Sequence, residues 1–382
     1  MLFGALAVLL TGQISPQMAL KSINADVMLF LFGVFIIGQA LEESGYLAHL
    51  AYRLFRRTKS LNSLILCILF SMGLLSALLM NDTLAIIGTP VVLSLAKKTN
   101  TQPKVLLLAL AFAITIGSVI SPIGNPQNLL VSIHGNVANP FVTFLRFLLV
   151  PTLLNLFLAY WLLRLFYRKH FNSQPLNHSP EPIVDRKLAT LARLSLILLA
   201  ALVVVKIATV LLGLAIDFRL TYIALIAALP IILFIPKRPG ILVRMDWHTL
   251  VFFAAMFVLM QSVWDTGVFQ SVISGTHLNI VSTGMILTVS VLLSQLISNV
   301  PLVALYLPML TQLGASTREM MALAAGSTIA GNLSILGAAS NVIIIQCADK
   351  RNCALTFFEF VRIGLPLTVI NVIVYWLFLT LM

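Results

Sequence analysis

The sequence predicts an all-α polytopic membrane protein built from two inverted-topology repeats, and three observations lead to this fold class. First, 60% of the 382 residues are hydrophobic and only 9% are charged, whereas soluble domains carry about 25% charged residues. Second, apolar stretches long enough to span a bilayer recur along the whole chain. Third, polar residues inside these stretches recur at constant spacing in the two halves. Lipid must therefore surround most of the protein surface.

About nine full spans are expected. They fall at residues 1–20, 27–42, 103–134, 144–168, 188–214, 219–236, 247–265, 319–347 and 357–381. Two other apolar stretches, 61–97 and 281–314, each contain two helical arms around a polar tip. The second arms are only about 15 residues, which is short for a crossing. We therefore predict re-entrant hairpins, although two full crossings at each would leave the topology unchanged.

The distribution of basic residues predicts the orientation. Most Lys and Arg residues of this chain, whose net charge is +12, fall on one side of the predicted topology, and only Lys21, Arg146, Arg219 and Arg318 fall on the other. The positive-inside rule makes the crowded side cytoplasmic, with the N-terminus inside and the C-terminus outside. Because the basic residues lie in short segments without interleaved aromatic residues, no nucleic-acid partner is expected. The three cysteines lack metal-ligand spacing.

An internal repeat sets the predicted domains. LLSALLMN, ending at Asn81, matches LLSQLISN, ending at Asn299, and SPIGNPQN from Ser121 matches SILGAASN from Ser334. Gln39 and Gly45 likewise match Gln261 and Gly267, and we call such pairs matched positions. The two predicted copies and the segment between them occupy these ranges: 1–168 (hairpin 61–97, broken helix 103–134), 219–382 (hairpin 281–314, broken helix 319–347), and 169–218, a cytoplasmic linker followed by one connecting span at 188–214. That single span inverts the second copy in the membrane.

Inverted repeats with interrupted helices near the bilayer midplane point to the binding site of a secondary transporter. A broken helix exposes N-terminal N–H groups, which attract anions, and free carbonyl groups, which can ligate cations. The candidate substrate- and ion-binding residues lie at the two hairpin tips and the two breaks: Asn81, Asp82, Thr83, Ser121, Gly124, Asn125, Gln127, Asn128, Ser298, Asn299, Asn332, Ser334, Gly337, Ser340 and Asn341.

The two predicted sites are chemically unequal. Asp82 is an ionisable residue at membrane depth, which is a functional hypothesis by default, whereas Val300 stands at the matched position. Asp82 is thus expected to bind a proton or cation, and the second tip is expected to be neutral. Lys206 lies within a span, where it could be a buried counter-ion, but a snorkelling side chain or a misjudged span end is the favoured reading. Glu43 and Asp265 are read mainly as helix-end residues, and Arg146 and Arg362 as interfacial anchors.

These motifs resemble the ion transporter superfamily, which includes arsenical permeases, citrate permeases, D-type sodium–proton antiporters and divalent-anion:sodium symporters. The resemblance rests on Asn81-Asp82-Thr83, Thr89-Pro90 and the stretch Ser121 to Asn128, and it covers residues 26–382. The GNPQN stretch is most similar to permeases of bacterial inner membranes. The symporter branch has Ser-Asn-Thr at its hairpin tips, so the tips of this chain favour the permease and antiporter branches.

The resemblance implies a scaffold domain and a transport domain, a homodimer in many members and, in the symporter branch, an elevator-like movement. It also implies Na+ sites, one formed by Asn81 and Asp82 with the Ser121–Gly124 loop and the other by Asn299 with the Ser334–Gly337 loop. A separate ATPase subunit, as in some arsenical permeases, is not indicated, since this chain has no P-loop.

The sequence therefore predicts a secondary transporter in a bacterial inner membrane. It would move a small inorganic or carboxylate anion, coupled to H+ or Na+, by alternating access around a midplane site between the hairpin tips, without a cofactor. The alternative is a Na+/H+ antiporter that uses Asp82. An intramembrane enzyme is not expected, because the chain lacks a HExxH helix and a second facing carboxylate at membrane depth.

Overall fold

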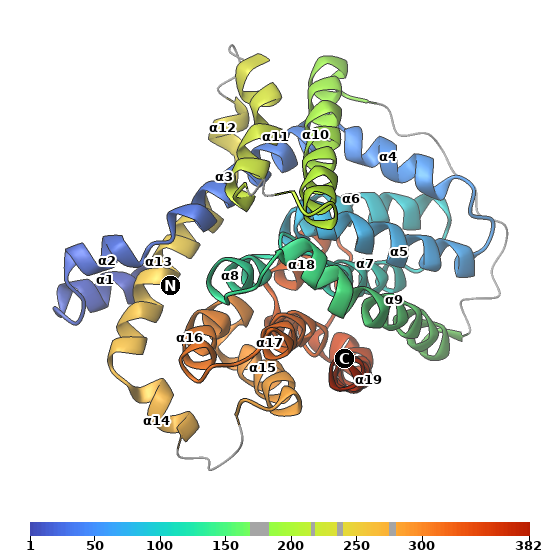
Figure 1. Cartoon of the computed structure of the whole chain (residues 1–382). Helices are drawn as coiled ribbons and strands as arrows, with labels where there is room; N and C mark the ends of the chain where they lie inside the picture. Colours follow the sequence, from blue (N-terminus) through green and yellow to red (C-terminus); the bar gives the residue numbers. More distant parts are fainter. Residues whose placement is uncertain (169–182, 215–217, 235–239, 275–279) are drawn as a thin grey trace.

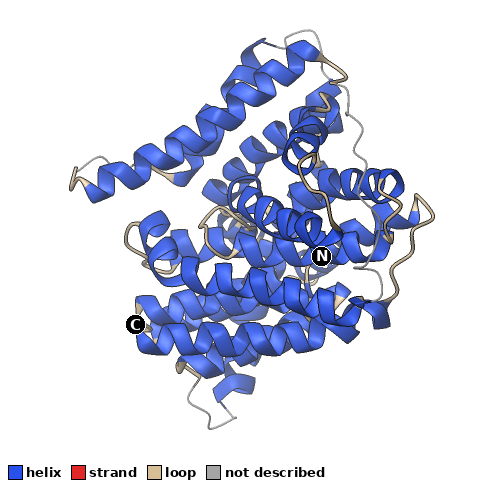
Figure 2. Ribbon diagram, turned by 90° about the vertical axis from the view of Figure 1, so that its right-hand side faces the viewer, coloured by secondary structure: helices blue, strands red, loops and turns tan. Residues whose placement is uncertain are grey.

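The computed structural model describes residues 1–168, 183–214, 218–234, 240–274 and 280–382. All regular structure in these ranges is helical (Figure 2), which confirms the predicted all-α class. The α-helices are α1 (Leu2–Leu10), α2 (Pro16–Ser22), α3 (Ala25–Glu43), α4 (Tyr46–Phe55), α5 (Leu61–Leu79), α6 (Asn81–Lys98), α7 (Pro103–Ser118), α8 (Pro126–His134), α9 (Pro140–Phe166), α10 (Arg186–Leu211), α11 (Leu220–Phe234), α12 (Gly240–Arg244), α13 (Trp247–Asp265), α14 (Val268–Ser274), α15 (Thr283–Ile297), α16 (Asn299–Gln312), α17 (Thr317–Ile329), α18 (Ala339–Asp349) and α19 (Phe357–Leu381). The short 3-10 helices η2 (Ala330–Asn332) and η3 (Ile335–Gly337) lie between α17 and α18.

Six helices of the described residues are long and apolar enough to cross a membrane: α3, α5, α9, α10, α13 and α19. The chain is thus a multi-pass membrane protein. α5 was expected only as a hairpin arm, yet its 19 residues extend about 28 Å. Re-entrance of the two hairpins stays a prediction. Of the expected linker at 169–187, residues 169–182 lie outside the described residues.

The first expected span, 1–20, is wrong as a single helix. The segment forms α1, of 9 residues, and α2, of 7 residues. Gly12 has a left-handed φ of 73°, and Pro16 lies at the first turn of α2 behind the N-cap Ser15, so the helix stops and restarts. A helix of this length covers only about 14 Å. The predicted N-terminal orientation, which counted residues 1–20 as one crossing, stays a prediction.

The two halves contain the same succession of seven α-helices, from α3 to α9 and from α13 to α19 (Figure 1). Each succession has a long helix, a short helix, a pair joined at a one-residue tip, a pair separated by a break, and a long final helix. A helix that precedes each succession packs against the first helix of the other half: α1 packs against α13, and α11 packs against α3. The hairpin arms also exchange partners: α6 packs against α18, and α16 against α8.

Side-chain caps fix the starts of the long helices. Asn24 caps α3, Ser60 caps α5, Asp246 caps α13 and Ser282 caps α15, each by accepting a hydrogen bond from a backbone N–H of the first turn. Such caps satisfy donors that would otherwise remain unpaired at the helix end. The sequence positions of these small polar residues thus determine where each helix begins.

The final helices of the two halves, α9 and α19, pack against each other in the core. Their contact is polar at the centre, since the Asn371 amide donates to Asn155 Oδ1 at 2.8 Å and the hydroxyl groups of Thr152 and Tyr375 lie 2.6 Å apart. Asn332, in the second break, donates to Asn371 Oδ1 at 2.9 Å. The four side chains from α9 and α19 (Thr152, Asn155, Asn371 and Tyr375) are all buried. This chain of hydrogen bonds joins the two halves next to the broken helices.

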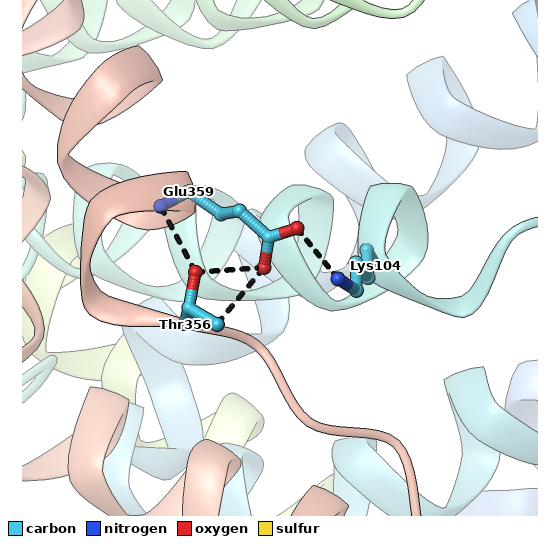
Figure 3. Close-up of polar contacts among 3 residues, drawn as sticks. All are labelled: Lys104, Thr356 and Glu359. Carbon is cyan, nitrogen blue, oxygen red and sulfur yellow. Dashed lines mark hydrogen bonds and ion pairs between the residues drawn. The ribbon is translucent and has the colours of Figure 1, made fainter.

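A second connection between the halves lies at the start of α7 and α19 (Figure 3). Lys104 donates to Glu359 Oε1, and Glu359 Oε2 accepts from the backbone N–H and the hydroxyl of Thr356 at 3.0 and 2.9 Å. Glu359 is therefore both an ion-pair partner and part of a capping box. The side chains of the ion pair are 34% and 36% exposed, so the pair itself contributes little to stability.

We expect the cap, not the ion pair, to carry most of the stabilisation at Glu359. Glu359→Gln keeps the capping box, so its free energy of unfolding should lie within about 0.5 kcal/mol of that of the parent protein. Glu359→Ala removes the cap as well, so its free energy of unfolding should be about 1 kcal/mol lower than that of Glu359→Gln. Thermal unfolding of the purified variants measures the difference. Equal losses for Gln and Ala would show that the ion pair dominates.

Candidate ion and substrate site

Both hairpin tips have the same backbone geometry. The single residue between the arms is Met80 at one tip (φ 65°, ψ 146°) and Ser298 at the other (φ 71°, ψ 161°). At each tip the following asparagine folds its side-chain oxygen back, so that Asn81 Oδ1 accepts from Asp82 N and Asn299 Oδ1 accepts from Val300 N, both at 3.0 Å. Non-glycine residues in this left-handed conformation are typical of functional sites that the surrounding structure holds under strain.

The first break lies between α7 and α8. Asn125 caps α8 by accepting from Asn128 N at 2.8 Å, and Pro126 occupies the first helical position, as the sequence predicts. The Asn128 amide donates to the freed carbonyl groups of Ser118 and Ser121 at 3.1 and 3.0 Å. Gly124 presents its carbonyl to Asn81 N at 3.0 Å. The structure thus brings the first tip and the first break together.

The second break, between α17 and α18, repeats this arrangement at matched positions. The Asn341 amide donates to the carbonyl groups of Gly331 and Ser334 at 2.5 and 3.4 Å. Gln295 of α15 joins the hairpin to the break, because its amide donates to Ala330 O at 2.9 Å and its oxygen accepts from Ser334 Oγ at 2.7 Å. Asn341 therefore holds the second break as Asn128 holds the first.

The breaks differ in how many of their oxygen atoms are engaged. In the first break, Asn128 Oδ1 lies 3.2 Å from Thr328 Oγ1, whose single proton also has Ala324 O as an acceptor at 2.7 Å. In the second break, buried oxygen atoms of Asn332, Ser340 and Asn341 have no hydrogen-bond partner within the described structure. Unpaired buried polar atoms are costly, so these oxygens are candidate ligand atoms. The second break thus offers free oxygen ligands, which the first break largely lacks.

Asp82 lies on the opposite face of its tip, toward α3. Its side chain is 8% exposed and lines a cavity of about 30 Å³ together with Gln39, Glu42, Thr83 and Asp246. We call this the α3–α6 cavity. Thr83 packs tightly there, because a Cβ on Gly38 of α3 would lie only 2.5 Å from Thr83 Cγ2. Sequence reasoning treated Asp82 as the one acidic residue at membrane depth, whereas the structure places Asp246 of the second half beside it.

A much larger cavity occupies the matched place in the second half. This α13–α16 cavity, of about 540 Å³, is lined by residues that include Asn24, His134, Gln261, Trp264 and Ala304. The matched pairs Gln39 and Gln261 line the two cavities, and so do the N-caps Asp246 and Asn24. The two cavities thus have related walls and very different volumes.

The candidate residues are almost all buried. Of the fifteen, Ser298 is half-buried, and the others are buried in the described structure. The first tip packs against the first break, and the second hairpin is joined to the second break through Gln295. Direct packing of one hairpin tip on the other, as a shared midplane site would require, stays a prediction.

The remaining residues singled out from the sequence have local roles. Glu43 and Asp265 end α3 and α13 as expected, and each accepts a hydrogen bond from the glutamine one turn earlier. Arg146 and Arg362 lie over aromatic rings, at 5.7 and 5.5 Å from the ring centroids. Lys206 does not snorkel, because it is 5% exposed and donates to Phe218 O at 3.0 Å.

Sequence reasoning missed several polar residues of the site. Thr328 accepts hydrogen bonds from the Asn125 and Gln127 amides at 3.2 and 3.3 Å. Its match with Thr115 at the spacing of the two breaks could have revealed it. Asp246 could have been found as the match of Asn24. For Gln295, whose matched position is occupied by an alanine, we find no signal in the sequence.

Comparison with known proteins identifies the family. A family model described as citrate transporter (CitMHS) matches residues 1–319. The chain belongs to this family. The match also confirms the resemblance to the ion transporter superfamily, and the chain is a membrane transporter of the anion permease type.

Several relatives match more than nine-tenths of this citrate transporter family chain. An uncharacterised transporter of Mycobacterium bovis is 30% identical and covers 92% of this chain and 84% of its own. The silicon efflux transporter LSI3 of Oryza sativa subsp. japonica is 28% identical and covers 97% and 89% of the two chains. The human P protein is 27% identical over 91% of this chain, which corresponds to 52% of the human protein.

A solved structure shares the fold. The crystal structure of the Alcanivorax borkumensis YdaH transporter, described as having an unusual topology, matches 95% of this chain and 86% of its own with a TM-score of 0.64. At 16% sequence identity, this likeness concerns the fold alone.

We expect the first break to tolerate no side chain at Gly124. A Cβ there would lie 2.2 Å from Ser118 O, so Gly124→Ala should destabilise the protein by about 1–3 kcal/mol or more. Gly240→Ala is the control, since a Cβ added at Gly240 would meet no atom within 4 Å, and it should change stability by no more than about 0.5 kcal/mol. Thermal unfolding compares the two variants. A Gly124→Ala protein as stable as the control would contradict the close packing of the break.

Proposed function

We propose that this citrate transporter family protein is a secondary active transporter that moves a small inorganic or carboxylate anion by alternating access. In this proposal the halves are inverted copies, and each copy lines one of two routes to a common site. The protein would work in a bacterial inner membrane, with H+ or Na+ as the coupling ion.

The observation that carries the proposal is the unequal size of the two matched cavities. The α13–α16 cavity has about 540 Å³ and the α3–α6 cavity about 30 Å³. Inverted copies place matched cavities on opposite sides of the membrane, so a transporter that opens to one side should have one cavity open and the other closed. Exchange of the two shapes between the copies would open the opposite side.

The substrate class follows from the groups at the breaks. The N-termini of α8 and α18 lie directly after the breaks, and helix N-termini favour anions. The neighbouring side chains are amides and hydroxyl groups, including Gln127 and Ser340, rather than basic groups. A small anion held by neutral donors can be released again, because no buried counter-charge holds it.

The coupling ion fits the second break better than the first. Na+ is a hard cation that prefers oxygen ligands, and the free oxygen atoms of Asn332, Ser340 and Asn341 supply them. In the first break the side-chain oxygen of Asn128 already has a hydroxyl group, Thr328 Oγ1, at 3.2 Å. The residues of the second break would therefore hold the ion, which would neutralise part of the charge of the anion beside it.

The second candidate is a Na+/H+ antiporter. One observation favours it: the buried carboxylate of Asp82 lies beside Asp246, with no basic residue among those that line the cavity. A carboxylate that is buried without a basic partner suits a proton or a cation better than an anion. In that case the anion route through the breaks would be absent.

A ligand screen separates these functions. Purified protein is heated with Na+, Li+, arsenite, phosphate, sulfate, citrate or dicarboxylates at two pH values. A ligand at 100 times its dissociation constant stabilises the native state by about 2.7 kcal/mol. Stabilisation by one anion, enhanced by Na+ or low pH, supports the transporter of anions. Stabilisation by Na+ or Li+ alone, stronger at high pH, supports the antiporter.

Transport by Asp82→Asn tests whether this residue couples ion movement. If Asp82 carries the coupling proton or Na+, as in the second candidate, the variant should fold and lose at least about tenfold in proton- or Na+-driven flux in proteoliposomes, equivalent to ~1.4 kcal/mol. Asp265→Asn is the matched control, because that carboxylate lies exposed at a helix end, and its flux should equal that of the parent. Undiminished flux in Asp82→Asn would remove this residue from the coupling mechanism.

A further inference from the structure

The walls of the α3–α6 and α13–α16 cavities differ systematically in charge. Glu42, Asp82 and Asp246 line the small cavity. The matched residues of the second half are Trp264, Val300 and Asn24. Every carboxylate of the first cavity is thus replaced by a neutral residue, while Gln39 and Gln261 are kept. Carboxylates thus line the α3–α6 cavity, and the matched positions of the second half carry none.

The carboxylate of Asp82 is unusually placed for a charged group. The residue as a whole is 8% exposed and lines the cavity, and no hydrogen bond to its carboxylate oxygens occurs among the described residues. Buried charges in proteins are normally paired or coordinate a cation. The free side chain of Asp82 on this cavity is therefore an independent indication of a ligand.

Asp246 reaches the same cavity from the opposite half. Its two oxygens accept from Thr249 N at 3.0 Å and from Thr249 Oγ1 at 2.5 Å, which fixes the carboxylate at the start of α13. Each carboxylate oxygen has a second lone pair, so this N-cap can also serve as a ligand. Asp82 and Asp246 thus belong to different halves and face one space.

The other charged groups near the cavity are engaged elsewhere. Glu42 is exposed at the rim. Glu43 accepts from Gln39 at 3.0 Å and pairs with Arg244 at 3.7 Å. Because the Gln39 amide donates to Glu43, the oxygen of Gln39 is the atom left for the cavity, and Thr83 adds a hydroxyl.

We infer that the α3–α6 cavity is a Na+ site, formed by the carboxylates of Asp82 and Asp246 with the oxygens of Gln39 and Thr83. The ligand set consists of oxygen atoms, as hard cations require. A cavity of about 30 Å³ has room for one small ion. No group of three or more acidic, histidine or cysteine side chains placed to hold a metal occurs among the described residues.

This site is distinct from the oxygen atoms at the two breaks and deepens the proposed function, on which its role in transport rests. A bound Na+ would bridge α6 of the first half to α13 of the second and hold the small cavity closed. Loss of the ion would leave the carboxylate of buried Asp82 and the carboxylate of half-buried Asp246 in mutual repulsion, and the cavity would open. In this proposal Na+ favours the conformation in which the α3–α6 cavity is small and the α13–α16 cavity is large.

The test measures Na+ binding by purified protein, as the shift in melting temperature on titration with NaCl against choline chloride at constant pH and ionic strength. We expect Asp82→Asn and Asp246→Asn each to weaken the apparent Na+ affinity by at least about tenfold, or ~1.4 kcal/mol. Asn is as good an N-cap as Asp, so Asp246→Asn removes the charge without removing the cap. Asp265→Asn is the control and should bind Na+ like the parent.

Three results would overturn the inference. Asp246→Asn with parental Na+ affinity would remove the second half from the site. Stabilisation by low pH without any response to Na+ would make the carboxylates a proton site. If Asp82→Asn unfolds the protein, Asp82→Glu is measured instead, because it keeps the carboxylate. Failure of a folded Asp82→Glu variant to bind Na+ is the third result that would overturn the inference. Binding needs no transport, so Na+ affinity without anion flux would contradict only the proposed function.

Discussion

The structure depends on the two asparagine side chains that hold the helix breaks. A helix interrupted within a bilayer leaves carbonyl groups without partners, and lipid offers none. The Asn128 amide donates to the carbonyl groups of Ser118 and Ser121, and the Asn341 amide donates to those of Gly331 and Ser334. These bonds allow unwound backbone, half-helix N-termini and hairpin tips to exist together at depth. The candidate site is a consequence of this constraint.

The two halves have the same backbone geometry at their tips and breaks, but different side chains. The tips share one left-handed residue and one folded-back asparagine, yet one is followed by Asp82 and the other by Val300. The breaks share one amide clamp, yet buried oxygen atoms are left unpaired mainly at the second. Backbone symmetry would let the two halves exchange conformations, whereas the differences in side chains would determine which ion stabilises which conformation. Directional coupling requires both properties.

Much of the architecture could be predicted from the sequence because its signals are local. The Asn125-Pro126 pair determines where α8 restarts, and apolar length determines the long helices. The first span failed because apolar composition hid a stop at Gly12 and a restart at Pro16. The partnership of Asp82 with Asp246 could not be read from the sequence, since it depends on how α6 packs near the start of α13. Likewise, the contact of Gln295 with the second break arises only from tertiary packing.

The central claim is that the matched cavities open in alternation, and a matched pair of single cysteines tests it most directly. Gln39→Cys and Gln261→Cys replace the same residue in the two cavities, in a background without Cys67, Cys347 and Cys353. We predict that in Na+ a water-soluble thiol reagent modifies position 261 faster than position 39, and that replacement of Na+ by choline raises the rate at 39 and lowers it at 261. Rates that rise or fall together at both positions would contradict alternating access.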